Sequence, residues 1–296
     1  MQKIEIMTLS RDKEKSVRKS GSGKSANDAA IRPFRFTSYG VRVEIISNRQ
    51  NIVSQAEAVV RKSLLNNVKP YRGKRFDHRF ELIHTDGGTY KLIQNGERLS
   101  YGRSRRKFFK YFDSIIRVAV GEYAVERVFL HAGVVAWRGR AILIPADSYK
   151  GKSTLVTELV RRGAEYYSDE FAILDADGLV SPFARPIAMR TTDGRFTPYE
   201  IELDSLGATT GIKPIPVGVI LLTGYKPGAR WRPEILTPGL GIIDLMPYTL
   251  SIRHAPEFSL SVLNKIARHA IIIRSLRGSA KNFSGILLDF VDKHLD

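Results

Sequence analysis

The sequence predicts an α/β protein in which a small N-terminal α/β region precedes a larger C-terminal domain. Residues Tyr39–Ile46 alternate between apolar and polar side chains, as in a half-buried strand, and Ile52–Leu65 carries apolar residues at helical spacing. The apolar run Ile142–Pro145 leads into a glycine-containing loop, and apolar residues then recur on one helical face of Ser153–Arg162. Strands that alternate with helices in this way are typical of the α/β class.

Residues 1–33 are polar, charged and rich in serine, lysine and glycine, which predicts a flexible basic tail. Within this tail, Ser20–Ser25 reads SGSGKS and looks like a phosphate-binding loop. No apolar strand precedes it, however, and Arg18 stands where the first glycine belongs. Because such a loop works only between a strand and a helix, we expect no nucleotide to bind there.

Residues 34–110 form the predicted N-terminal α/β region. The runs Phe80–His84 and Tyr90–Ile93 flank a turn sequence with two glycines, which predicts a β-hairpin. Helical spacing over Phe108–Val125 predicts a helix that leads into the next domain. We therefore place the boundary near residue 110, which leaves residues 111–296 for the C-terminal domain.

The composition is typical of a folded cytoplasmic protein. The chain has 296 residues, of which 43% are hydrophobic, and it has no cysteine, so disulfides, thiolate metal sites and thiol nucleophiles are excluded. The N-terminus has no apolar run of the kind found in a signal peptide, and apolar stretches such as Val217–Leu222 are too short to cross a bilayer. We expect a cytoplasmic protein with no membrane partner.

The formal net charge of +17 raises the question of a nucleic-acid partner. The charge is spread along the chain, and the dense patch Arg103–Lys107 lacks the regular aromatic spacing of an RNA-binding signature. We therefore disfavour nucleic acid and favour a solvated basic face. An acidic partner or an anionic substrate is the alternative.

The stretch Ile142–Leu155, ILIPADSYKGKSTL, ends like a nucleotide-binding P-loop. Gly151 allows the backbone to approach a phosphate, Lys152 supplies positive charge near the β- and γ-phosphates, and the Ser153 hydroxyl can hold Mg²⁺. Ala146 replaces the usual first glycine, and alanine is tolerated there if its φ is negative. The predicted nucleotide-binding residues are Asp147, Ser148, Tyr149, Lys150, Gly151, Lys152, Ser153 and Thr154.

Two adjacent carboxylates, Asp169 and Glu170, begin a strand-like run about sixteen residues after Ser153. One carboxylate can accept the proton of an attacking hydroxyl while its neighbour helps to hold Mg²⁺. The alternative is a solvated turn, an interpretation that suits Asp175 and Asp177 better.

Three elements in this order and spacing resemble the C-terminal catalytic domain of the HPr kinase/phosphorylase family: His131, the loop PADSYKGKST and the run YYSDEFAILD. The likeness continues through Ser181–Arg190 and Tyr225–Pro233 and covers about residues 125–290. It is closer to the HPr-kinase-related serine kinases than to the bacterial enzyme that controls sugar transport. The resemblance implies a P-loop kinase fold of the HPr kinase/phosphoenolpyruvate carboxykinase type, built on a mixed sheet.

The resemblance also implies roles for individual residues. Asp169 matches the catalytic aspartate, Glu170 the carboxylate near the metal, and His131 the histidine near the transferred phosphate. ATP and Mg²⁺ are the implied cofactors. Glutamate replaces the family's second aspartate, Tyr149 and Lys150 replace small residues, and the segment for phosphorolysis and hexamer contacts is not found. Phosphorylase activity, HPr as substrate and a hexamer are therefore left open.

Two pairs of arginines are candidate substrate-binding residues. Arg185 and Arg190 flank a predicted strand near the acidic pair, and Arg230 and Arg232 bracket a tryptophan in a loop rich in proline and glycine. A guanidinium donates two parallel hydrogen bonds and so suits phosphate or carboxylate. Ordinary surface arginines are the alternative in so basic a chain.

The sequence thus predicts an ATP-dependent kinase that transfers the γ-phosphate to a hydroxyl, with serine of a protein or peptide as the acceptor. A nucleotide-binding regulatory module without turnover is the main alternative, suggested by Ala146 and the altered acidic pair, and a nucleic-acid-binding protein is the third. A homo-oligomer is left open.

Overall fold

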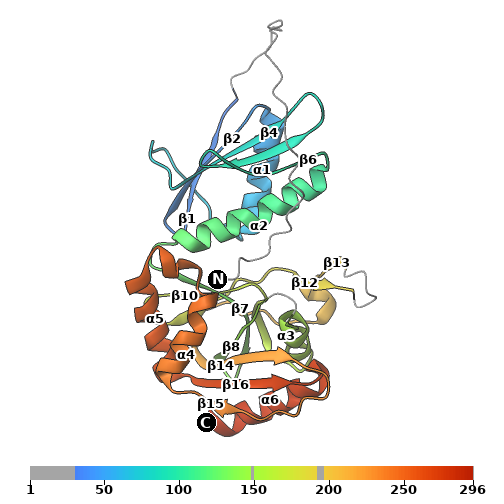
Figure 1. Cartoon of the computed structure of the whole chain (residues 1–296), viewed down its shortest axis with the longest axis vertical. Coiled ribbons are helices and arrows are strands. Elements are labelled where there is room, and N and C mark those ends of the chain that lie inside the picture. The colour runs from blue at the N-terminus through green and yellow to red at the C-terminus, as the bar shows by residue number, and fades with distance from the viewer. Residues whose placement is uncertain (1–30, 148–149, 192–196, 296) are drawn as a thin grey trace, which may run out of the picture. The chain divides into compact units, whose positions relative to one another are not determined.

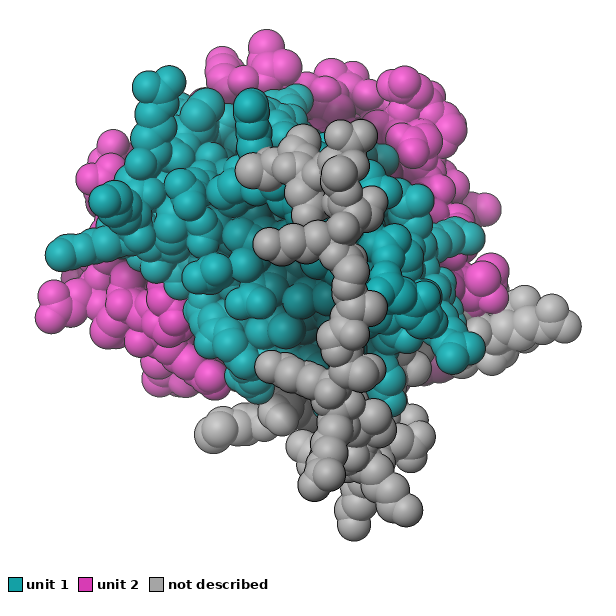
Figure 2. All heavy atoms as spheres, turned by 90° about the horizontal axis from the view of Figure 1, so that it is seen from above, with its two compact units in different colours: residues 1–37, 42–116 teal, residues 38–41, 117–296 magenta. Residues whose placement is uncertain are grey.

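The structure is a computed structural model that describes residues 31–147, 150–191 and 197–295 (Figure 1). The SGSGKS stretch and most of the predicted tail lie outside these residues, as do Ser148 and Tyr149. The chain divides into unit 1, Met1–Thr37 with Arg42–Ile116, and unit 2, Ser38–Val41 with Arg117–Asp296; Figure 2 colours them teal and magenta. Each unit is an α/β structure with its own sheet.

Unit 1 contains a six-stranded sheet with the order β3-β1-β2-β4-β5-β6. Strands β2 and β4 are parallel, whereas β4–β5 and β5–β6 are antiparallel pairs. The predicted hairpin is confirmed as β4 and β5, which pair from Phe80 with Gln94 to His84 with Tyr90. The strands are β1 (Phe34–Ser38), β2 (Val41–Ser47), β3 (Lys69–Pro70), β4 (His78–His84), β5 (Tyr90–Gln94) and β6 (Glu97–Gly102).

Two helices complete this part of the chain, α1 (Gln50–Ser63) and α2 (Arg105–Tyr123). Both predicted helices are thereby confirmed, with ends shifted by two or three residues. Phe112 of α2 packs edge-on against Phe80 of β4, with ring centroids 5.8 Å apart, so the helix is anchored to the sheet by a buried aromatic pair. Helix α2 runs through residue 110, and the division between the units falls inside it, between Ile116 and Arg117.

Unit 2 is built on an eight-stranded mixed sheet with the order β11-β10-β7-β8-β14-β16-β15, and β9 pairs with β7. Strands β8, β14 and β16 are parallel neighbours, whereas β7 is antiparallel to β8. A two-stranded sheet, β12–β13, accompanies it. The strands are β7 (Val128–Trp137), β8 (Arg140–Pro145), β9 (Glu165–Ser168), β10 (Phe171–Leu174), β11 (Leu179–Ser181), β12 (Ile187–Arg190), β13 (Pro198–Ile201), β14 (Ile215–Tyr225), β15 (Glu234–Ile235) and β16 (Ile271–Arg277).

Helices cover both faces of this sheet (Figure 1). Along β14, Ile220 and Leu222 belong to the core with α4 and α5, while Val219 and Leu221 belong to the core with α3 and α6. Burial on both sides explains why Val217–Leu222 is almost continuously apolar instead of alternating. The helices are α3 (Lys152–Arg161), α4 (Pro238–Leu245), α5 (Pro256–His269) and α6 (Ala280–His294), with single 3₁₀ turns η1 (Leu203–Leu206), η2 (Met246–Tyr248) and η3 (Leu250–Arg253).

The parallel strands β8, β14 and β16 end at one edge of the sheet, with Pro145, Tyr225 and Arg277 as their last residues. Ligands of α/β proteins commonly bind outside the carboxyl ends of such strands. The predicted P-loop follows β8 and therefore lies at this edge. Among the helices that the structure describes, none combines the length and apolar character needed to span a membrane.

Candidate active site

The loop between β8 and α3 has the strand, loop and helix order that the sequence predicts. Gly151 is the N-cap of α3 and has φ 77°, a left-handed conformation that favours glycine. Ala146 is buried and has no positive φ, so alanine fits where the first glycine was expected. The first-turn N–H groups of α3 and its helix dipole can attract an anion at this end.

Lys152 reaches across the sheet edge to His131 of β7, with 2.9 Å between Nζ and Nε2. When Lys152 is protonated, its ammonium only donates, so Nε2 of His131 accepts and the imidazole proton is on Nδ1. Burial, with a further contribution from the nearby Lys152 charge, lowers the pKa of His131 from 6.5 to about 3, so the ring is neutral at physiological pH. Burial also lowers the pKa of Lys152, against the opposing effect of the carboxylates of Asp169 and Glu170.

Gly133, two residues after His131 on β7, makes room for this arrangement. A Cβ on Gly133 would lie 2.5 Å from Cγ2 of Val156 and 3.2 Å from Cγ of Lys152. The missing side chain therefore lets α3 approach β7 closely and lets the Lys152 stem pass over the strand.

Asp169 and Glu170 form the turn between β9 and β10. The Ser168 hydroxyl accepts hydrogen bonds from the backbone N–H groups of Glu170 (3.1 Å) and Phe171 (3.0 Å), which holds the turn. The single strand-like run predicted here is thus two strands, and the carboxylates sit at their junction instead of on an open strand. The expectation of a strand that begins at the carboxylates holds for β10 only.

Asp169 is 9% exposed, and its Oδ1 has no hydrogen-bond partner in the described part of the chain. Burial raises its pKa from 3.8 to about 6, and the neighbouring Glu170 charge adds to this. Lys152 and a hydrogen bond with the Ser153 side chain act in the opposite direction. The loop helix and the acidic turn are therefore in direct contact through Ser153 and Asp169.

Glu170 forms an ion pair with Arg117 of α2, with 2.8 Å between Oε1 and Nε. Arg117 is 6% exposed and was not predicted, since nothing in the helical spacing separates it from the many other basic residues. We refer to the group formed by His131, Lys152, Ser153, Asp169, Glu170 and Arg117 as the Lys152 cluster.

Arg277, the last residue of β16, is a second residue that sequence reasoning missed. It is 2% exposed and donates from Nη2 to the Gly151 carbonyl (2.6 Å) and from Nη1 to the Gly278 carbonyl (3.1 Å). Its Nε has no hydrogen-bond partner and the guanidinium makes no ion pair within the described residues, and burial lowers its pKa. A buried cation without a counter-ion beside the loop suits a site for anions.

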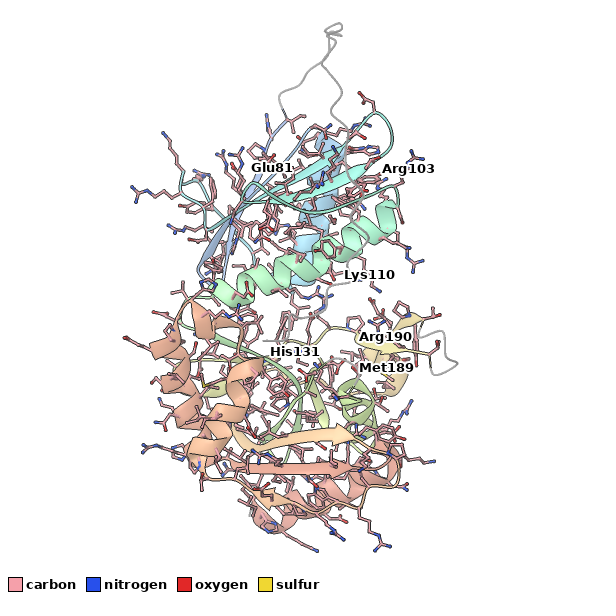
Figure 3. All side chains as sticks on the ribbon, viewed as in Figure 1. Glu81, Arg103, Lys110, His131, Met189 and Arg190 are labelled. Carbon is pink, nitrogen blue, oxygen red and sulfur yellow. The ribbon has the colours of Figure 1, made fainter. Side chains whose placement is uncertain are left out.

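The predicted arginines lie in different places. The Arg185 carbonyl accepts a hydrogen bond from the Tyr166 hydroxyl (2.8 Å), and the charges of Asp169 and Glu170 add to the burial that raises the pKa of Tyr166, so Arg185 lies near the Lys152 cluster. Arg190 is exposed at the end of β12, and Figure 3 labels it beside Met189 of the same strand.

Arg230 and Arg232 are exposed in the loop after β14, outside the Lys152 cluster. Within the P-loop, the side chains of Asp147, Lys150 and Thr154 are exposed. The structure thus brings together five predicted residues, His131, Lys152, Ser153, Asp169 and Glu170.

The residues of the Lys152 cluster fit a Mg²⁺ ion only together with a phosphate ligand. The described ranges contain no group of three or more histidine, cysteine, aspartate or glutamate side chains that could hold a metal by themselves. Mg²⁺ in phosphate-transfer sites is commonly held by one or two carboxylates together with substrate phosphates. Ser153 and Glu170 could supply such ligands beside Asp169.

No model of a known protein family matches the chain, and no curated protein matches it. The resemblance to the HPr kinase/phosphorylase family therefore stays a prediction based on the motifs.

Proposed function

We propose that the chain is an ATP-dependent kinase that transfers the γ-phosphate to a hydroxyl, with serine of a protein or peptide as the acceptor. The observation that carries the proposal is the contact between the two halves of the Lys152 cluster. Lys152 and Ser153, at the start of the helix after the loop, lie against His131 and Asp169 on the neighbouring strands. A phosphate-binding helix end and a base are thereby adjacent.

Lys152 and the N-terminal N–H groups of α3 are the groups proposed to bind the phosphates. Among the described residues, the Lys152 side chain has the neutral His131 ring as its hydrogen-bond partner. A phosphate oxygen is a stronger acceptor for an ammonium than an imidazole nitrogen because both partners are then charged. Mg²⁺ held by Ser153 and Glu170 would supply charge that offsets the β- and γ-phosphates.

Asp169 is proposed as the general base. Its unpartnered Oδ1 can accept the proton of the acceptor hydroxyl while that oxygen forms a bond to the γ-phosphorus. The bond from the γ-phosphorus to the bridging oxygen breaks, and ADP leaves with that electron pair. The raised pKa of Asp169 makes its carboxylate a better proton acceptor than an ordinary aspartate.

The finer fold assignment is part of the same proposal. We infer a P-loop kinase fold of the HPr kinase/phosphoenolpyruvate carboxykinase type, supported by the mixed sheet of unit 2 and by the β8, loop and α3 order at its edge. We also propose a cytoplasmic location, where ATP and Mg²⁺ are available.

An acidic protein or peptide is the acceptor that the charge favours. The formal net charge is +17, and the candidate substrate arginines Arg190, Arg230 and Arg232 are exposed. Complementary charge speeds association and disfavours basic partners.

A regulatory module that binds nucleotide without turnover is the second candidate. It is favoured by the ion pair between Glu170 and Arg117, which already neutralises the carboxylate assigned to the metal. In that case the nucleotide would act only as a ligand.

The test is the rate of phosphate transfer in a single turnover at saturating Mg-ATP. Acidic serine-containing peptides serve as acceptors, with ADP formation as the readout for transfer to water. Asp169→Asn should retain ATP and slow transfer by about 10²–10⁴-fold, because the amide occupies the same space but does not accept the proton. Asp175→Asn is the matched control, since Asp175 only holds the turn after β10 through Asp177 and Leu179 N–H groups.

An Asp169→Asn rate equal to the wild-type rate would exclude the general-base role. A wild-type protein that binds ATP but transfers no phosphate to any acceptor would establish the regulatory module instead.

A further inference from the structure

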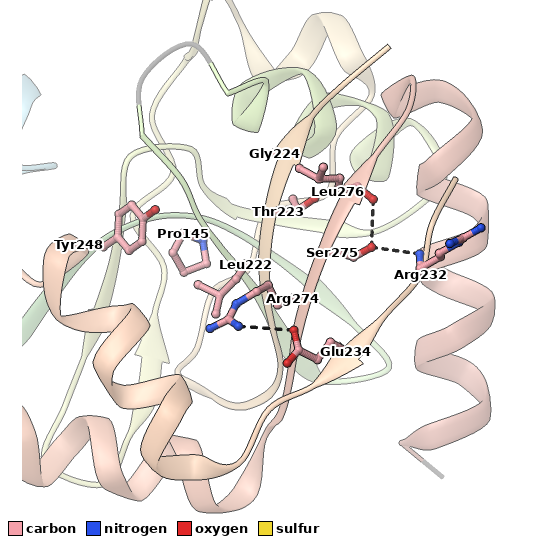
Figure 4. Close-up of a pocket in the computed structure, with 10 residues that line it drawn as sticks. All are labelled: Pro145, Leu222, Thr223, Gly224, Arg232, Glu234, Tyr248, Arg274, Ser275 and Leu276. Atoms are coloured by element: carbon pink, nitrogen blue, oxygen red, sulfur yellow. Dashed lines mark hydrogen bonds and ion pairs between the residues drawn. The ribbon is translucent and has the colours of Figure 1, made fainter. Parts of the chain in front are cut away.

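A pocket of about 460 Å³ lies at the carboxyl ends of the parallel strands of unit 2 (Figure 4). Its volume falls within the range of roughly 300–1,000 Å³ that is usual for small-molecule sites. We refer to this cavity as the strand-end pocket, and its lining includes Pro145, Leu222, Gly224, Glu234, Tyr248 and Arg274. None of these residues belongs to the Lys152 cluster.

The strand order places the strand-end pocket and the carboxylates on opposite sides of the P-loop. The loop follows β8, which lies between β7 and β14 in the sheet. Asp169 and Glu170 lie at the junction of β9 and β10, the two strands that pair with β7, whereas the pocket is bordered by β14 and β16. A triphosphate with its γ-phosphate beside Asp169 can therefore extend past the P-loop toward β14 and β16.

The strand-end pocket is continuous with the P-loop. Pro145, which lines it, is the last residue of β8 and immediately precedes Ala146. Tyr248 of η2 also lines it, and burial together with the carboxylates of Asp147 and Asp244 raises the pKa of its phenol. The charge of the loop residue Asp147 thus acts on Tyr248, which places the phenol near the loop.

One of the two arginines that line the pocket is already neutralised, whereas the second, Arg232, is exposed. Arg274 is already paired with two carboxylates: its guanidinium donates to Asp244, with 3.1 Å from Nε to Oδ2, and to Glu234, with 3.4 Å from Nη1 to Oε2. Glu234 is mostly exposed, so its carboxylate can still accept hydrogen bonds from ligand hydroxyls.

The rest of the wall suits a flat ring. Pro145 and Tyr248 lie together at one end of the pocket, and Leu222 lies next to them (Figure 4). A phenol ring beside aliphatic surface provides a face on which a nucleobase can stack. Sugar hydroxyls fit the polar part around Glu234 and Ser275.

We propose that the strand-end pocket binds the nucleoside half, base and ribose, of the nucleotide whose phosphates bind the P-loop. The inference depends on the proposed nucleotide-dependent function and extends it to residues that no motif identified. Tyr248, Leu222 and Pro145 contact the base, and Glu234 binds the ribose hydroxyls.

Gly224→Leu tests the proposal because it fills the pocket without removing a contact. A Cβ on Gly224 would meet only Cδ2 of Leu276, at 3.6 Å, and the residue has no positive φ. Calorimetry with the full chain measures the Kd of Mg-ATP and of Mg-tripolyphosphate, which has the phosphates but no nucleoside. We expect Gly224→Leu to weaken ATP binding about tenfold and to leave tripolyphosphate binding within twofold.

Gly239→Leu on α4 is the matched control, since a Cβ there has no neighbour within 4 Å, and it should change neither Kd. Tyr248→Ala is a second test in case Gly224→Leu fails to fold, and it should show the same selective loss of ATP affinity. Unchanged ATP binding in a folded variant of either kind, or an equal loss for both ligands, overturns the nucleoside assignment while the proposed function stands. A wild-type chain that binds neither ligand overturns both.

Discussion

In unit 1, Asp77 accepts hydrogen bonds from two nitrogens of the Arg42 guanidinium, whereas in unit 2 the buried carboxyl of Asp169 keeps one oxygen without a hydrogen bond from any described residue. The Arg42 distances are 3.0 Å from Nε and 2.6 Å from Nη2, and the backbone N–H of Arg42 donates at 2.8 Å. The hydrogen bond from Arg42 is the largest cause of the lowered pKa of Asp77. Its carboxylate is therefore stabilised in the folded state.

The Lys152 cluster has the opposite pattern of pKa changes. Burial raises the pKa of Asp169 and lowers those of Lys152 and His131, so each group is held closer to its neutral form than in water. Such disfavoured charges are common where a ligand or a reaction later supplies the missing partner. The difference between Asp77 and Asp169 separates a carboxylate that stabilises the fold from one that is suited to chemistry.

Among the substitutions predicted below, Gly133→Ala should have the largest effect, and it should act on the Lys152 cluster but not on Asp77. The added methyl group would lie 2.5 Å from Cγ2 of Val156, so helix α3 must move away from β7 and displace Lys152. We expect the variant to lose about 1–3 kcal/mol of unfolding free energy and most of its affinity for Mg-ATP. Denaturant unfolding and calorimetry measure the two effects.

Gly102→Ala in unit 1 is the control for Gly133→Ala, because a Cβ there meets nothing within 4 Å. It should leave ATP affinity unchanged. A Gly133→Ala protein with wild-type stability and wild-type affinity would show that α3 does not depend on the close approach.

Asp169→Asn and Asp77→Asn should change stability in opposite directions at pH 7.5. The pKa of Asp169 rises to about 6 on folding, so as the pH increases this carboxyl ionises in the unfolded chain before it ionises in the folded chain. The unfolding free energy of the wild type therefore falls between about pH 4 and 6 and stays lower at higher pH. Removing this charge should therefore raise the unfolding free energy by on the order of 2 kcal/mol at pH 7.5 and have no effect below pH 4.

The pKa of Asp77 is lowered on folding, so its contribution is present above its ordinary pKa and is lost in acid. Asp77→Asn should cost on the order of 1 kcal/mol at pH 7.5, a loss that fades at low pH. Thermal unfolding at several pH values with a chelator present measures both variants. A destabilised Asp169→Asn protein at pH 7.5 would mean that the folded state stabilises the ionised carboxylate of Asp169, as it stabilises that of Asp77.

The elements that sequence reasoning recovered have a local signal. The β4–β5 hairpin, helix α1 and the β8–α3 connection each follow from apolar periodicity and turn residues within about twenty positions. The junction at Asp169 was missed as a turn although a local signal exists, since a serine directly before two acidic residues often caps such a turn.

The contacts that complete the site are not local. Arg117 reaches Glu170 from 53 positions away in the sequence, and Arg277 reaches Gly151 from 126 positions away. Neither arginine differs in its local sequence from the many exposed basic residues, so only the fold identifies them. The strand-end pocket is likewise formed by residues from four strands and a 3₁₀ turn.

Binding of a nucleotide to the P-loop through Lys152 should change the melting temperature of the full chain, measured with and without Mg-ATP. At a ligand concentration one hundred times the Kd, binding should add about 2.7 kcal/mol to the unfolding free energy of the wild type. Lys152→Ala should lose this stabilisation while keeping its fold, and the surface control Lys265→Ala should retain it. A wild type that ATP does not stabilise, or a Lys152→Ala protein that ATP stabilises in full, would contradict the phosphate-loop assignment.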